Sequence, residues 1–180
     1  MNAPYRDVQQ AIRSALNVGA RSLYSPASWQ ALAGSGYRES SLRGDMSRLE
    51  SFQQACMTLA LLHYEMPAHL WAILVVRYAP PLADQAEFDR MKAAVLAVAG
   101  HLECSRTEFA RWAVAHWGNR LPPERARWDH WNNRDLGAIS TLKRLYGKDI
   151  KPSLGNMERL AKITAENLLS INGVIEKAAA

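Results

Sequence analysis

The sequence has few cysteines, and they are not placed for a disulfide framework or a metal site. Only Cys56 and Cys104 occur among the 180 residues, which excludes the paired-cysteine zinc finger and the disulfide-dense secreted domain. A reducing, cytoplasmic location is therefore expected. His101, Cys104 and His116 are the nearest approach to a metal-ligand set, and their spacing resembles no zinc finger. We predict no cofactor and no bound metal.

Long apolar runs are also lacking. No segment reaches the roughly 18 consecutive apolar residues that a membrane-spanning helix needs, and the N-terminus has no apolar core of the kind found in signal peptides. Neither a membrane partner nor export is expected. Runs rich in valine, isoleucine and threonine, which favour strands, are scarce, whereas alanine, leucine, arginine and tryptophan are plentiful. An all-α fold is predicted.

A catalytic constellation is a third absence. His63, His69 and His130 have no evident nucleophile or orienting carboxylate near them in the sequence. The acidic residues mostly stand beside arginines, an arrangement typical of surface ion pairs. The protein is therefore not expected to be an enzyme.

What the chain does have is helical periodicity. Apolar residues recur every three or four positions in residues 5–16, 45–64, 68–79, 84–102, 135–146 and 153–178. Gly19 and Gly147 are expected to end helices, and Phe88, Leu160 and Ile171 are among the apolar positions expected to be buried. Residues 25–44, rich in serine and glycine, predict a loop-rich connection. We divide the chain into N-terminal helices with this connection (1–64), a helix-turn-helix core (65–120), and a basic loop with C-terminal helices (121–180), forming one compact unit.

Residues 98–117 predict the helix-turn-helix. Ser105 and Glu108 have the spacing of a capping box, which places the start of the second helix at Ser105. Glu103 stands where the motif usually has glycine to turn the corner, so a somewhat strained turn is expected. A purely structural pair of helices is the alternative interpretation. Six positions match the packing pattern of the motif: Val98, Ala99, Leu102, Cys104, Phe109 and Trp112.

The positive charge is concentrated in residues 105–151, which hold ten basic and five acidic side chains; this excess equals the whole net charge of +5. Such clustering favours a polyanionic partner, and an ordinary solvated surface is the alternative. Together with the predicted helix-turn-helix, it makes double-stranded DNA the expected partner. A DNA-reading helix would present Arg106, Thr107, Ala110 and Arg111 to base edges. Phosphate contacts are predicted for Arg120, Arg125, Arg127, Arg134, Lys143 and Arg144.

Trp128 and Trp131 lie three residues apart within the basic segment 118–134. Single-stranded nucleic acid could stack its bases on such rings. Tryptophans at this spacing more often hold a short helix against a core, and we favour that interpretation.

Two segments resemble a known family when they are taken in order. LWAILVVRYAP at residues 70–80 and LECSRTEFARWAVAH at residues 102–116 are similar to phage Q-type transcription antitermination factors, including the AlpA-type regulators of bacterial genomes. The same order occurs in the DNA-binding C-terminal regions of sigma factors. The resemblance covers about residues 67–117 and implies a small helical protein that binds promoter-proximal DNA. The DNA-binding role would carry over to Arg106, Thr107 and Arg111.

The resemblance also implies what such a protein does once it is bound. Members load onto a paused RNA polymerase that still holds its sigma factor, and they narrow the RNA exit channel so that terminator hairpins cannot fold. Polymerase with sigma is therefore an expected partner, and nascent RNA is a further candidate. Two alternatives stand beside this function: an ordinary helix-turn-helix repressor or activator, and a phage-type helical protein that binds and inhibits a host protein.

Overall fold

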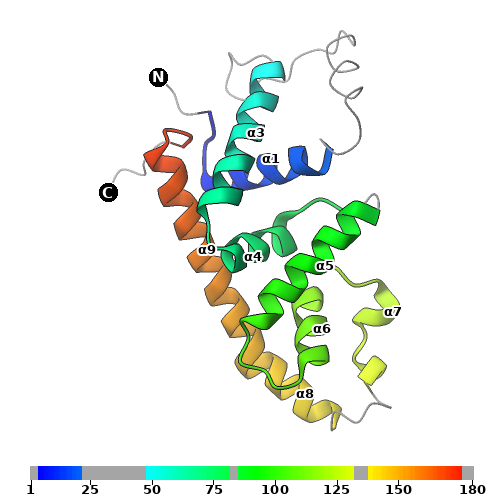
Figure 1. Ribbon diagram of the computed structural model, residues 1–180. Helices are drawn as coiled ribbons and strands as arrows, with labels where there is room; N and C mark the ends of the chain where they lie inside the picture. The colour runs from blue at the N-terminus through cyan, green and yellow to red at the C-terminus, as the bar shows by residue number, and fades with distance from the viewer. Residues whose placement is uncertain (1–3, 22–47, 82–84, 132–137, 176–180) are drawn as a thin grey trace. The chain divides into compact units, whose positions relative to one another are not determined.

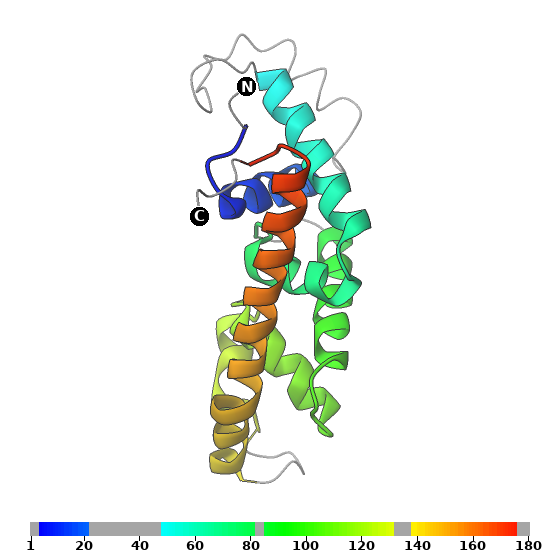
Figure 2. The ribbon, with the colours of Figure 1, turned by 90° about the vertical axis from the view of Figure 1, so that its left-hand side faces the viewer.

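The computed structural model describes residues 4–21, 48–81, 85–131 and 138–175, and the predicted connection at 25–44 lies outside them. The described chain is built from helices (Figures 1 and 2), which confirms the all-α prediction. The elements are α1 (Val8–Arg21), α3 (Arg48–Glu65), α4 (Ala68–Tyr78), α5 (Gln85–Gly100), α6 (Thr107–Trp117), α7 (Pro123–Ala126), the 3₁₀-helix η2 (Trp128–Trp131), α8 (Ile139–Leu145), the π-helix η3 (Tyr146–Ile150) and α9 (Lys151–Ile171).

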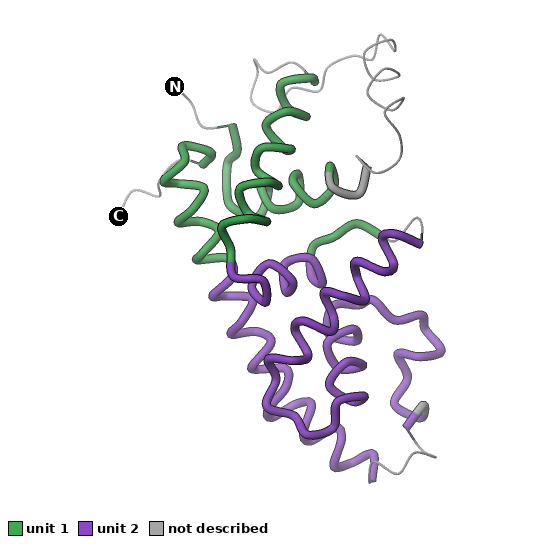
Figure 3. Tube along the Cα trace, in the orientation of Figure 1, with its two compact units in different colours: residues 1–66, 78–81, 162–180 green, residues 67–77, 82–161 purple. Residues whose placement is uncertain are grey.

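The chain divides into two compact units (Figure 3). The first unit comprises residues 1–66, 78–81 and 162–180, and the second comprises residues 67–77 and 82–161. This differs from the three consecutive segments, forming one unit, that the sequence suggested. The reason is that the second half of α9 belongs with the N-terminal helices, and a pattern read along the chain does not show such a long-range association.

In the first unit, α1 crosses α3 and packs against it (Figure 1). Ile12 and Ala15 of α1 are fully buried, as expected for the stripe of an amphipathic helix. Gly19 does not end this helix, which continues to Arg21. On α3 the apolar spacing of residues 45–64 predicts burial of both Leu49 and Leu62, and this is only partly correct, because Leu62 is buried but Leu49 is exposed.

The two ends of the described chain meet in this unit. The Tyr5 N–H donates to the Val174 carbonyl at 3.3 Å. The last helix ends in a Schellman motif: Gly173 has a φ of +69°, its N–H bonds to the Ser170 carbonyl, and the Val174 N–H bonds to the Leu169 carbonyl at 2.8 Å. The helix therefore ends earlier than the predicted residue 178, at a glycine that can adopt the left-handed conformation.

In the second unit, α4 supplies much of the core. Five of its side chains are buried: Leu70, Ala72, Ile73, Leu74 and Val76, as expected for a helix that is apolar on nearly every side. Helix α5 packs on α6, but its buried stripe differs from the predicted one. Phe88 is 51% exposed, whereas Glu87 is only 7% exposed. The stripe runs through Glu87, Met91, Ala94 and Val98. It keeps the helical spacing, but Glu87 and Ala94 are buried where Phe88 and Val95 are predicted.

Gly147 was expected to end a helix, and that prediction is wrong. The chain continues from α8 through η3 into α9 without a break (Figure 2). Because Pro152 lacks an N–H, it cannot donate the usual helical bond there, and just before it the Lys151 N–H bonds to the Tyr146 carbonyl in the wider π-type turn. Ile150 and Leu154 are buried along this run, whereas Leu160 and Ile171, predicted as core, are exposed.

Candidate functional site

The pair formed by α5 and α6 carries the predicted packing positions. Val98, Ala99, Phe109 and Trp112 are buried, and Leu102 and Cys104 are half-buried. Burial is therefore confirmed at four of the six packing positions, and it is partial at Leu102 and Cys104. That the pair reads DNA stays a prediction.

The corner between the two helices is made without glycine. The Cys104 N–H bonds to the Leu102 carbonyl at 2.7 Å, so the chain turns through Glu103 in a three-residue turn. Glu103 has no positive φ, since Asn119 is the only non-glycine with one in the described part of the chain. A glycine is not needed in a turn of this shape, and the expected strain at Glu103 is not found.

Helix α6 begins at Thr107, not at Ser105. Arg106 is the N-cap residue, with φ −93° and ψ 78°, and its side chain makes no capping hydrogen bond. The Cys104 thiol lies 3.7 Å from the Arg106 carbonyl oxygen. The tight turn at Glu103 thus delays the helix beyond the serine that the capping-box spacing indicated.

The four predicted base-reading residues fall into different environments. Thr107 and Arg111 are exposed, and they lie four residues apart, so they share one face of α6. Ala110 is only 1% exposed, and its prediction as a base contact is wrong because α6 is covered on more than one side by its neighbours. Arg106 is half-buried.

The predicted phosphate-binding residues are mostly on the surface. Arg125, Arg127, Lys143 and Arg144 are exposed, and Arg134 lies outside the described residues. Two of the exposed side chains have neighbours of their own. The guanidinium of Arg127 lies 3.4 Å from the Asp129 carboxylate, and the Lys143 ammonium lies 5.8 Å from the centre of the Trp128 ring.

Arg120 has a structural role instead. Its Nε donates to the Val76 carbonyl at 2.7 Å, at the C-terminal end of α4, where helix carbonyls lack intrahelical partners. Arg77 makes the reciprocal contact, because its Nη1 donates to the Trp117 carbonyl at 3.3 Å. Burial, with a smaller effect of Arg77, lowers the pKa of Arg120. The two arginines thus join the ends of α4 and α6.

An aromatic cluster surrounds the buried side of α6. Trp131 is 1% exposed, and its ring centre lies 5.5 Å from that of Phe109 and 5.7 Å from that of Trp112. The Trp112 Nε1–H donates to the Arg125 carbonyl at 2.7 Å, which fixes α7 to α6. Trp128 is half-buried, 4.8 Å from the Trp112 ring centre. The core interpretation of the two sequence-predicted tryptophans therefore fits the structure better than base stacking.

His69, His101 and His116 each lie against another ring. His116 stacks on Trp112 with ring centres 4.6 Å apart, and burial lowers its pKa, which favours the neutral imidazole. The ring centres of His69 and His101 lie 4.2 Å apart. Burial lowers the pKa of His69, and the nearby His101 lowers it further.

Within the described residues, no group of three or more His, Cys, Asp or Glu side chains could hold a metal ion. In the same part of the chain, no helix is both long and apolar enough to cross a membrane.

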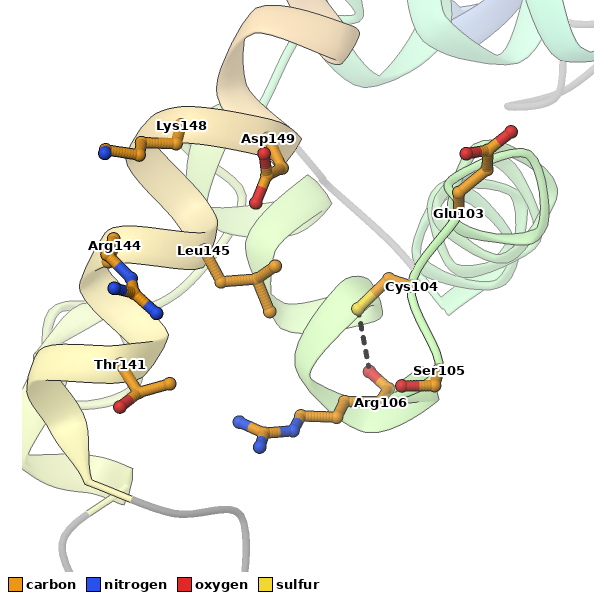
Figure 4. A pocket seen from close by; sticks show the side chains of 9 residues that line it. All are labelled: Glu103, Cys104, Ser105, Arg106, Thr141, Arg144, Leu145, Lys148 and Asp149. Carbon is orange, nitrogen blue, oxygen red and sulfur yellow. Dashed lines mark hydrogen bonds between the residues drawn. The ribbon is translucent and has the colours of Figure 1, made fainter.

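A pocket of about 480 Å³ lies at the start of α6 (Figure 4). It brings together the residues of the corner and of the α8–η3 run: Glu103, Cys104, Ser105, Arg106, Thr141, Arg144, Leu145, Lys148 and Asp149. The sequence indicated Arg106 and Arg144 separately but missed Thr141, Lys148 and Asp149. The four-residue spacing of Arg144 and Lys148 was the available signal, since it favours one helix face. Gly147 obscures this signal, because glycine is typical of helix ends.

No protein-family model, no curated protein and no solved structure matches this chain. The resemblance to phage Q-type antitermination factors stays a prediction.

Proposed function

We propose that the second unit binds double-stranded DNA through the start of α6 and the basic residues beside it. The observation that carries this proposal is a convergence of cations from two distant parts of the chain. Arg106, at the start of α6, shares one pocket with Arg144 and Lys148 of α8 and η3. Thr107 and Arg111 are exposed on the first turns of the same α6 helix.

The chemistry of these residues suits a duplex. Arginine offers parallel N–H donors to guanine and to phosphate oxygens, and a helix N-terminus favours phosphate because its backbone N–H groups and dipole are positive there. Thr107 and Arg111 would contact base edges. Arg125, Arg127, Lys143 and Arg144 would contact the backbone, which positions the protein without specifying sequence.

We further propose that the DNA-bound protein acts on RNA polymerase holding its sigma factor, as a transcription antitermination factor. The resemblance of residues 67–117 to phage Q-type factors supports this step. The surface that would meet polymerase is not assigned to particular residues, since no motif identifies it.

Arg111→Ala is expected to weaken binding to a duplex selected from a random-sequence pool, and to cost about 1–3 kcal/mol of discrimination between bases. Lys92→Ala is the control, because Lys92 is an exposed cation on α5 outside the proposed contact. Fluorescence anisotropy at several salt concentrations measures both effects. Wild-type affinity should fall steeply with salt. A response that is nearly independent of salt would instead favour a protein partner, such as an inhibited host protein.

A reporter gene behind an intrinsic terminator tests the polymerase step. Readthrough is expected when the protein and its promoter-proximal element are both present, and it should be lost with Arg111→Ala. An ordinary repressor or activator would change expression equally with and without the terminator. Readthrough that needs no promoter element would contradict loading from DNA.

A further inference from the structure

We propose that the pocket at the start of α6 is a binding site for a phosphate group, with the guanidinium groups of Arg106 and Arg144 as its principal ligands. This assigns Arg106 to phosphate and not to a base edge. The phosphate could belong to a free anion or nucleotide, or to a DNA backbone. Only the DNA form of this inference rests on the proposed function.

The main evidence is the state of Arg106. Its Nη1 is buried and makes no hydrogen bond to the described protein. A buried charged donor without a partner raises the free energy of the folded protein. We therefore expect a bound ligand to accept a hydrogen bond from this guanidinium. Figure 4 shows the side chain extending from the start of α6 toward Thr141 and Arg144 on the opposite wall.

The opposite wall adds positive charge and a hydroxyl. Arg144 and Thr141 are exposed residues of α8, three positions apart, and both line the pocket. Neither Arg144 nor Lys148 forms an ion pair with another residue in the described ranges. Two guanidinium groups facing one space repel each other, and a dianion placed between them would remove that repulsion and accept several charge-assisted hydrogen bonds.

Two acidic residues, Glu103 and Asp149, also line the pocket. Glu103 points away from the pocket, whereas the carboxylate of Asp149 points into it (Figure 4). Asp149 should therefore oppose a bound anion. Its removal should tighten phosphate binding, which a merely structural role of these residues would not cause.

The helix geometry around Asp149 is also unusual. Lys148 and Asp149 belong to the π-helix η3, a rare form that is frequent at functional sites. The wider turn changes which residues of the α8–η3 run face the pocket compared with a regular helix. The pocket volume of about 480 Å³ is also larger than one phosphate needs and lies in the range of small-ligand sites.

Titration with inorganic phosphate, followed by protein NMR, tests the site without DNA. Chloride at matched ionic strength is the salt control. Shifts should concentrate on residues 103–106 and 141–149. Arg106→Gln is expected to weaken phosphate binding about tenfold to a hundredfold, as loss of a charge-assisted bond implies, and Asp149→Asn should strengthen it. Lys92→Ala should leave it unchanged. If Arg106→Gln does not fold, Arg144→Gln takes its place, because Arg144 is exposed.

Duplex binding by the same variants identifies the source of the phosphate. If Arg106→Gln weakens both inorganic phosphate and duplex binding, the pocket holds a DNA phosphate. Phosphate binding with no duplex binding by the wild type supports a free phosphate or nucleotide and overturns the proposed function alone. Duplex binding that is unchanged in Arg106→Gln and Arg144→Gln, together with no phosphate-specific shifts, overturns the pocket and leaves the proposed function standing.

Discussion

Replacing Trp112 by alanine is expected to lower the free energy of unfolding by about 3–5 kcal/mol, a large part of the total stability of an ordinary domain. Trp112 is 7% exposed, and its ring contacts five others: Phe109, His116, Trp128, Trp131 and Tyr146. Alanine would leave a cavity where these rings meet. It would also remove the donor to the Arg125 carbonyl. Urea denaturation followed by circular dichroism measures the loss.

Trp112→Phe is the matched variant for the hydrogen bond. It keeps an aromatic ring in the cluster but removes the Nε1–H that bonds to the Arg125 carbonyl at 2.7 Å. A smaller loss of about 1–3 kcal/mol is expected. If alanine and phenylalanine destabilise the protein equally, the hydrogen bond and not the ring packing is the source of the stability. A loss below about 1 kcal/mol for alanine would show that the cluster is not a core, since buried large-to-small changes cost more.

Gly118→Ala is expected to destabilise the protein by about 1–3 kcal/mol, the usual cost of overpacking. A Cβ at this position would lie 2.5 Å from Val76 Cγ1 and 3.0 Å from the Val76 carbonyl oxygen. Val76 is fully buried, and its carbonyl accepts the Arg120 hydrogen bond, so neither group can move away without loss. The close approach of the ends of α4 and α6 therefore requires glycine.

Gly155→Ala is the control, because a Cβ there meets nothing within 4 Å and Gly155 lies inside α9. Alanine in such a helix should stabilise the protein by up to about 1 kcal/mol. The two substitutions are thus expected to shift the thermal midpoint in opposite directions. Stabilisation by alanine at both positions would show that helix propensity, and not the contact with Val76, decides the outcome at Gly118.

Helices were the part of the fold most open to prediction, because their signals are local. Residues 68–79 are apolar between prolines, and α4 follows that segment closely. At the corner, the packing positions Val98 and Phe109 are buried as predicted. Helical periodicity depends only on neighbours along the chain, so a single sequence is enough to find it.

The candidate site was only partly predictable. Arg106, Thr107 and Arg111 were indicated by their place on one helix, and two of the three are exposed. The pocket itself was missed, because it joins the corner at residues 103–106 to the α8–η3 run at residues 141–149. No periodic pattern links segments that far apart.

The sequence by itself determined the helical class of the protein, the position of most helices and the absence of paired cysteines, since each of these depends on composition or on nearby residues. Tertiary structure alone decided which face of each helix is covered. It buried Ala110 and Glu87, exposed Phe88, turned Arg120 inward to bond with α4, and placed Arg106 opposite Arg144. Burial and charge proximity are properties of surfaces brought together from distant segments, and the spacing of residues along one helix does not contain them.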